Sequence, residues 1–160
     1  PCGYGLPAIV GAKIGQPDVP VVGFAGDGAF GIAVNELTAI GRGDWPPITQ
    51  IVFRNYQWGA EKRNSTLWFE DNFVGTELDE QVSYAGIAKA CGLVGVVART
   101  QDELTDALSQ AIKDQMENGK TTLIEAMINQ ELGDPFRRDA MKKPVEVAGI
   151  SKEDMRPQAV

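Results

Sequence analysis

The stretch "GFAGDGAFG" at residues 23–31 combines glycines with an acidic residue in a pattern that can bind phosphate. Gly26, Gly28 and Gly31 have the G-x-G-x-x-G spacing of a dinucleotide-binding turn, and they follow an apolar run that predicts a buried strand. Asp27 stands between the first two glycines, where a pyrophosphate would come closest to the backbone. A carboxylate there would repel phosphate, but it could hold phosphate through a divalent cation. The pattern therefore predicts a diphosphate site that depends on a metal ion.

A second metal ligand is expected at the end of the next predicted strand, at residues 48–53. Asn55 follows that strand, 28 residues after Asp27, which is room for one helix and one strand. The carboxyl ends of neighbouring parallel strands meet at one edge of a sheet. Mg²⁺ takes carboxylate, amide and carbonyl oxygens and fills its remaining positions with phosphate and water. We therefore predict Asp27 and Asn55 as metal ligands, with the carbonyl oxygen of Gln57 as a third.

The absence of histidine from all 160 residues narrows the chemistry further. It removes Ser-His-Asp and Cys-His nucleophile systems, imidazole-bound zinc and the usual general base near neutral pH. Cys2 and Cys91 are far apart and are interpreted as small buried apolar residues rather than a disulfide. If the chain is part of an enzyme, carboxylates, lysines or a cofactor must move its protons.

The apolar periodicity predicts the elements that would position these residues. Helices are expected at 4–15, 30–40, 82–91 and 101–118, and strands at 20–25, 48–53, 93–98 and 121–128. Thr100 and Glu103 form a capping box at the start of the last helix. Residues 54–76 are expected to be a long functional loop. This order predicts an α/β fold with a parallel sheet flanked by helices on both faces.

Composition bounds the partners and the domain organisation. A hydrophobic fraction of 43% and a charged fraction of 23% are typical of a globular protein, and a net charge of −7 argues against nucleic acid. No apolar run approaches the roughly 20 residues that span a membrane, so a cytoplasmic protein is expected. Residues 1–130 are predicted to form one domain and 131–160 a C-terminal tail with prolines and mixed charges. The sequence at Pro1 resembles the middle of a domain, so we expect a fragment of a longer chain.

Gly26-Asp27-Gly28, a helix, a strand and then Asn55 at this separation resemble the motif of thiamine diphosphate-dependent enzymes. The resemblance covers residues 1 to about 130 and implies the thiamine diphosphate-binding fold, with thiamine diphosphate and Mg²⁺ as cofactors. Where most members have Asn-Asn, this chain has Arg54-Asn55. The resemblance gives the metal ligands named above, offers the backbone N–H groups of Gly28 and Ala29 to phosphate, and implies the cofactor-binding residues Gly26, Asp27, Gly28, Ala29, Asn55, Gln57, Trp58 and Gly59.

Residues 55–62 and 131–140 are similar to segments of the sulfoacetaldehyde acetyltransferase family. That family converts sulfoacetaldehyde and phosphate to acetyl phosphate and sulfite, which implies a place in taurine metabolism. Both substrates are anions, so cationic side chains near the site are substrate candidates: Arg54, Lys62, Arg63, Arg137 and Arg138. The resemblance also implies a homo-oligomer, dimer or tetramer, whose activating glutamate lies in a separate N-terminal domain of the partner subunit. The catalytic residues of this chain therefore stay unknown, and the chain alone is expected to be inactive.

Three other interpretations stay open from the sequence. The chain could belong to an acetolactate synthase-like carboligase or a 2-oxo acid decarboxylase. It could be an NADP-binding Rossmann domain in which Arg54 reads the 2′-phosphate, although Asp27 counts against this. It could also be a non-catalytic fragment that keeps the fold and binds no cofactor.

Overall fold

The computed structural model describes residues 2–131, in two compact units. The first unit comprises residues up to 58 together with 75–130, and the second contains residues 59–74. Within the described range no helix combines the length and apolar character that a membrane crossing requires.

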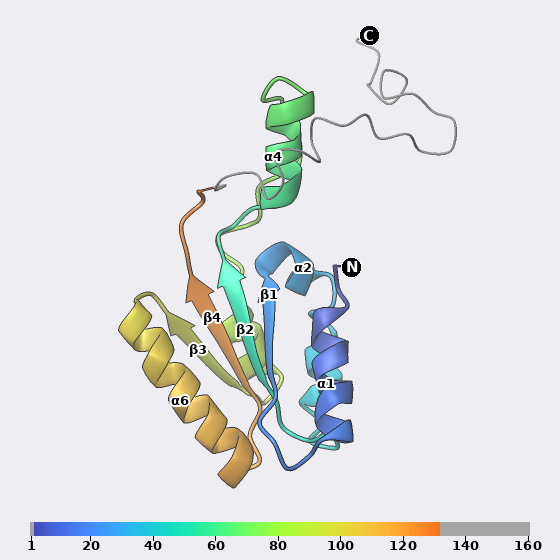
Figure 1. The fold of residues 1–160 in the computed structure, drawn as a ribbon, viewed down its shortest axis with the longest axis vertical. Coiled ribbons are helices and arrows are strands. Elements are labelled where there is room, and N and C mark those ends of the chain that lie inside the picture. Colours follow the sequence, from blue (N-terminus) through green and yellow to red (C-terminus); the bar gives the residue numbers. More distant parts are fainter. Residues whose placement is uncertain (1, 132–160) are drawn as a thin grey trace, which may run out of the picture. The chain divides into compact units, whose positions relative to one another are not determined.

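The first unit is built on a four-stranded parallel sheet with the order β1-β2-β4-β3. Each predicted strand is confirmed to within two residues. The register pairs Gly26 with Phe53 and Arg54 with Met127, so the strands β1, β2 and β4 end together at one edge (Figure 1). The strands are β1 (Val22–Gly26), β2 (Thr49–Arg54), β3 (Val94–Ala98) and β4 (Thr122–Met127).

Helices cover both faces of this sheet, as the sequence predicts. Successive strand residues point to opposite faces, so Val52 packs in one apolar cluster and its neighbour Ile51 packs in the other. The Val52 cluster includes Leu6 of α1 (Gly5–Gly15) and Ala88 of α5 (Tyr84–Ala90), and the Ile51 cluster includes Ala111 of α6 (Gln101–Glu117). Figure 1 shows α6 beside β3 and β4, and α1 beside β1.

The predicted start of α6 is confirmed, with one difference in the capping box. The Thr100 hydroxyl accepts from the Glu103 N–H at 3.2 Å, as expected. The Glu103 carboxylate reaches one residue further back and accepts from the Arg99 N–H at 2.6 Å. Both bonds satisfy backbone donors at the helix start, so this end of α6 is fixed by its own sequence.

The single helix predicted over residues 30–40 is wrong. Two short helices, α2 (Asp27–Gly31) and α3 (Glu36–Ile40), flank a tighter stretch. There the N–H of Ala33 donates to the carbonyl of Phe30, and the N–H of Glu36 to that of Ala33, which is the i→i−3 pattern of a 3₁₀ turn. The predicted apolar face is nevertheless buried. Both cysteines are free as expected, although neither is fully buried: Cys2 is exposed and Cys91 is half-buried.

In the second unit, the loop expected over residues 54–76 contains the helix α4 (Gly59–Trp68). The apolar periodicity does not predict this helix, because its side chains are mostly polar and form no apolar stripe. Its first turns instead contain good helix formers such as Ala60, Glu61 and Lys62. Glu70 and Asp71 follow with φ of 51° and 62°, a left-handed turn that ends the helical segment.

Candidate cofactor and metal site

The two residues predicted as metal ligands lie at the carboxyl edge of the sheet. Asp27 follows β1 and Asn55 follows β2, and these strands are hydrogen-bonded neighbours. The Asp27 side chain is buried, with 1% of the residue exposed. The topology therefore brings together two side chains that are 28 residues apart in the sequence.

The two carboxylate oxygens of Asp27 have different surroundings. Oδ2 accepts three hydrogen bonds, from Arg54 Nη1 at 3.1 Å and from the N–H groups of Asn55 at 3.1 Å and Tyr56 at 2.7 Å. Tyr56 has a φ of 60°, so the chain turns sharply after β2 and directs these N–H groups back to the carboxylate. Oδ1 accepts from the neighbouring Gly28 N–H at 2.9 Å. The donors on Oδ2 thus fix the carboxylate and leave Oδ1 as its ligand-facing oxygen.

The side chain of Asn55 closes this group. One terminal atom of its amide lies 3.3 Å from Asp27 Oδ1 and 3.2 Å from the carbonyl oxygen of Gln57. A nitrogen in this place would donate to both acceptors, while an oxygen would complete a set of three converging oxygens and accept from the Gln57 N–H at 3.3 Å. Oxygens that share an octahedral Mg²⁺ stand about 2.9 Å apart. The three predicted ligand groups therefore converge at spacings that suit a small divalent cation.

The charge around Asp27 also suits a cation. Asp27, Arg54 and Glu125 are at most 3% exposed, and the guanidinium lies 3.1 Å from Asp27 Oδ2 and 3.5 Å from Glu125 Oε1. Two carboxylates and one guanidinium leave one negative charge in a buried environment, where a further cation is favourable. Residues 2–131 contain no cluster of three or more His, Cys, Asp or Glu able to hold a metal. A metal here would instead need the mixed oxygen set of Asp27, Asn55 and Gln57.

The two glycines beside Asp27, Gly26 and Gly28, lie in different surroundings. At Gly28, a Cβ would come within 2.9 Å of Cε3 of Trp58, so the indole ring requires a residue without a side chain. At Gly26, φ is −71° and a Cβ would meet nothing within 4 Å. Neither the backbone conformation nor the packing requires a glycine at residue 26. The open space beside it leaves room for a ligand to approach the backbone.

The other predicted cofactor residues occupy several environments. Gln57 is buried, and its Nε2 donates to the Gln130 carbonyl at 2.8 Å while its Oε1 has no hydrogen-bond partner. Its main-chain carbonyl, rather than its side chain, faces Asn55. The Ala29 carbonyl accepts from the Gly3 N–H at 3.1 Å, which ties the start of the chain to α2. Gly59 begins α4 in the second unit.

Arg54 is predicted from the sequence as a substrate-binding residue, but its side chain is buried and bonded to the protein. Its side chain is 1% exposed, and Nη2 donates to the carbonyls of Asp79 at 2.6 Å and Val82 at 3.0 Å. The guanidinium thus donates to acceptors of the protein. An external anion could not reach the guanidinium without displacing these acceptors. We therefore remove Arg54 from the substrate-anion candidates. Sequence reasoning missed its partner Glu125, whose signal is a single acidic residue inside the apolar strand at 121–128.

The remaining anion candidates lie in the second unit or outside the described residues. Lys62 and Arg63 are half-buried on α4 in the second unit, where the Lys62 ammonium lies 5.5 Å from the centre of the Phe73 ring. Arg137 and Arg138 lie outside the described residues.

Tyr84, at the start of α5, supports Asp27 from the backbone side. Its hydroxyl donates to the Asp27 carbonyl at 3.1 Å, and its ring packs edge-on against Phe30 at 5.1 Å. Burial raises the pKa of Tyr84, and the nearby Arg54 guanidinium opposes this only in part. The phenol therefore remains a hydrogen-bond donor to Asp27 at neutral pH.

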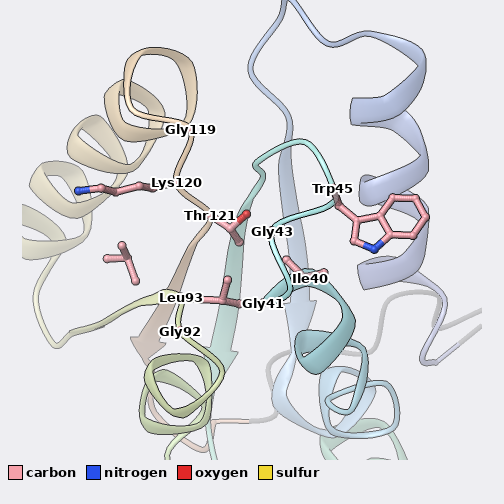
Figure 2. Close-up of a pocket in the computed structure, with 10 residues that line it drawn as sticks. Ile40, Gly41, Gly43, Trp45, Gly92, Leu93, Gly119, Lys120 and Thr121 are labelled. Atoms are coloured by element: carbon pink, nitrogen blue, oxygen red, sulfur yellow. The ribbon is translucent and has the colours of Figure 1, made fainter.

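A separate cavity of about 320 Å³ lies at the opposite, amino edge of the sheet. Figure 2 shows that its lining comes from the segments that follow the helices and lead into the strands. It holds none of the predicted ligand groups. Its lining residues are Ile40, Gly41, Gly43, Trp45, Gly92, Leu93, Val94, Gly119, Lys120 and Thr121.

Comparison with known proteins gives one family and several relatives. Residues 1–126 match the family described as "Thiamine pyrophosphate enzyme, C-terminal TPP binding domain". The chain is 85% identical over 160 residues to a protein named "Sulfoacetaldehyde acetyltransferase" from Roseovarius nubinhibens, in a match that covers 100% of this chain and 26% of that protein. A protein of the same name from Rhodobacter capsulatus is 79% identical over 158 residues, which are 99% of this chain and 27% of that protein.

Among solved structures, the fold is similar to that of benzoylformate decarboxylase from Polynucleobacter necessarius. The match has a TM-score of 0.68 and 26% sequence identity, and it covers 82% of this chain and 24% of that chain. The chain thus spans about a quarter of the length of the relatives that it matches.

Proposed function

This chain belongs to the thiamine pyrophosphate enzyme family as a C-terminal TPP-binding domain, and from that premise we propose that its carboxyl sheet edge holds the cofactor diphosphate through Mg²⁺. The observation that carries the proposal is the convergence of Asp27 Oδ1, the Asn55 amide and the Gln57 carbonyl oxygen, with separations of 3.2 and 3.3 Å. These three groups would hold the metal. Open space beside Gly26 supports a close approach of the diphosphate to the backbone, where Gly28 and Ala29 would offer N–H groups.

The residues of this chain would bind and orient rather than transfer protons. When bound, thiamine diphosphate supplies a nucleophilic carbon and an electron sink. The hydrogen bonds of Arg54, Asn55 and Tyr56 to Asp27 Oδ2 fix the carboxylate before any ligand arrives, which lowers the cost of ordering the site. Trp58 packs against Gly28 and would border the diphosphate, with Gly59 following it. The activating glutamate would come from another domain, so this chain supplies half of the site.

For the complete protein we propose sulfoacetaldehyde acetyltransferase activity, which converts sulfoacetaldehyde and phosphate to acetyl phosphate and sulfite. The name of the relative that is 85% identical over the whole chain supports this activity. Lys62, Arg63, Arg137 and Arg138 remain candidates for contacts with the two anionic substrates. The proposal includes a cytoplasmic homo-oligomer, dimer or tetramer, that acts in taurine metabolism, with residues 1–130 as the cofactor domain and 131–160 as its C-terminal tail.

The test uses the complete natural polypeptide that contains this chain. Sulfite and acetyl phosphate are measured after incubation with sulfoacetaldehyde, phosphate, thiamine diphosphate and Mg²⁺. The proposal predicts equal amounts of the two products, no sulfite when EDTA is added, and at most one sulfite per active site when phosphate is omitted. Conversion of pyruvate to acetolactate without sulfite release would favour a carboligase. Binding of NADP, or of no cofactor at all, would contradict the cofactor assignment itself.

A further inference from the structure

A line of buried charges runs from the metal site into the sheet. Asp27 follows β1, Arg54 ends β2 and Glu125 lies on β4, and β2 is the strand between the other two. The guanidinium therefore stands between two carboxylates, with Nη1 at 3.1 Å from Asp27 Oδ2 and Nε at 3.5 Å from Glu125 Oε1. Only Asp27 belongs to the set of metal ligands proposed above.

The guanidinium of Arg54 is fixed on several sides. Nη2 donates to the carbonyls of Asp79 and Val82, and Cζ lies 4.2 Å from the Tyr56 ring centre and 5.0 Å from that of Tyr84. These contacts hold the guanidinium in place, and its Nη1 donates to Oδ2 of Asp27. This selects which oxygen remains for a metal.

Glu125 is also fixed, and its two carboxylate oxygens contact different groups. Oε2 accepts from the Ser83 hydroxyl at 2.8 Å and from the Ala85 N–H at 3.1 Å, at the start of α5. Oε1 faces Arg54 Nε, which has no hydrogen-bond partner of its own. Glu125 therefore contributes charge to the guanidinium without a short hydrogen bond to it. Without that charge, Arg54 would draw more strongly on Asp27 and would compete with a metal for the same carboxylate.

From this arrangement we propose that Glu125, acting through Arg54, is a positioning residue of the metal site. Arg54 holds Asp27 Oδ2 so that Oδ1 faces the metal, and the charge of Glu125 offsets that of the guanidinium, so that Arg54 does not cancel the attraction of Asp27 for the metal. The proposal rests on the proposed function, because it needs a metal at Asp27. It also gives a physical reason for an arginine at residue 54.

The test replaces Glu125 by glutamine in the complete protein. Glu125→Gln keeps the size of the side chain and an oxygen acceptor for Ser83 and Ala85, and it replaces the charged oxygen that faces Arg54 by a neutral NH₂ group. The Mg²⁺ dissociation constant is measured by calorimetry in the presence of saturating thiamine diphosphate. We expect it to rise about 10-fold or more, as is typical when a residue behind a metal ligand is changed. The Mg²⁺ concentration for half-maximal sulfite release should rise in parallel, with little change in kcat at saturating Mg²⁺.

Two further variants separate positioning from stability. Gln115→Leu removes a buried hydrogen-bonding group at the amino edge, where Gln115 contacts Val21 and Thr49, and it should leave the Mg²⁺ affinity within about twofold. Arg54→Lys keeps the positive charge but cannot span Asp27, Glu125 and the two carbonyls, so it should weaken Mg²⁺ binding even if Glu125→Gln fails to fold.

Two results would overturn the inference alone. One is a Glu125→Gln protein that binds Mg²⁺ as tightly as the unaltered protein, and the other is an equal loss of affinity in Gln115→Leu. Failure of the proposed function is read separately, in the unaltered protein, as the absence of metal-dependent cofactor binding. That result would remove the basis of the inference as well.

Discussion

The two edges of the same sheet use buried polar groups in opposite ways. At the amino edge, the buried ammonium of Lys13 donates to the carbonyls of Pro17 at 2.8 Å and Val19 at 2.7 Å and contacts the Met116 sulfur at 3.5 Å. Gln115 bridges the backbone of Val21 there. These groups are satisfied by neutral partners that belong to the fold.

At the carboxyl edge, the buried groups include charged side chains, and some of their polar atoms face the proposed ligand position. Asp27 and Arg54 pair at 3.1 Å, and one terminal atom of the Asn55 amide lies 3.3 Å from Asp27 Oδ1 and 3.2 Å from the Gln57 carbonyl oxygen. The cavity of about 320 Å³ lies at the other edge. The chemistry of the lining, rather than the size of a hollow, therefore locates the candidate site in this domain.

The largest expected effect is on folding, from Arg54→Met. It leaves the carboxylates of Asp27 and Glu125 buried without their shared cation, which should lower the free energy of unfolding by about 3–5 kcal/mol. Urea denaturation in EDTA measures this. A loss below about 1 kcal/mol would mean that the charged edge contributes no more to the fold than a surface ion pair.

Asp27→Asn should abolish most of the metal-dependent cofactor affinity. The amide keeps an acceptor for the N–H groups on Oδ2 but removes the charge that the metal needs, so thiamine diphosphate affinity in Mg²⁺ should fall on the order of 100-fold. Calorimetric titration of the complete protein, with Mg²⁺ and with EDTA, measures the loss. The matched control is Asp44→Asn, in an exposed pair with Arg42, which should bind the cofactor normally.

Lys13→Met probes the amino edge and should separate stability from binding. Two buried carbonyls lose their donor, so the free energy of unfolding should fall by about 1–3 kcal/mol. Cofactor affinity in Mg²⁺ should stay unchanged. If this variant instead lost affinity to the same extent as Asp27→Asn, the two edges would not be functionally distinct.

Tyr84→Phe should have the smallest effect, and it should appear mainly in alkali. Burial raises the pKa of Tyr84 above its usual value of 10.0, so the folded protein holds this proton more tightly than the unfolded chain does. The resulting stabilisation is present below pH 10.0 and is lost as the pH rises through the higher pKa of the folded state. Urea denaturation at a series of pH values should therefore show a shallower alkaline loss in Tyr84→Phe. An unchanged slope would contradict this role.

Much of this edge could be predicted from the sequence because it depends on local signals. The apolar runs gave the strands, and the order of elements gave a parallel sheet, which alone brings Asp27 and Asn55 together. The broken helix over residues 30–40 was missed because its apolar face continues through the 3₁₀ stretch. The helix α4 was missed because propensity, and not periodicity, forms it.

The role of Arg54 could not be read from the sequence because it depends on three strands at once. A basic residue directly after an apolar strand looks like a ligand-binding group at the sheet edge. The strand register sets Arg54 beside Asp27 on one side and near Glu125 on the other. Only this arrangement shows that the guanidinium pairs with carboxylates of the protein. The isolated acidic residue in the 121–128 strand was the available signal.

The most direct test of the central claim is a crystal structure of the complete protein with thiamine diphosphate and Mn²⁺, whose anomalous scattering locates the metal. We expect one metal within about 2.5 Å of Asp27 Oδ1, the Asn55 side-chain oxygen and the Gln57 carbonyl oxygen, with the diphosphate beside Gly26. A metal bound elsewhere, or a diphosphate away from the carboxyl edge of the sheet, would contradict it.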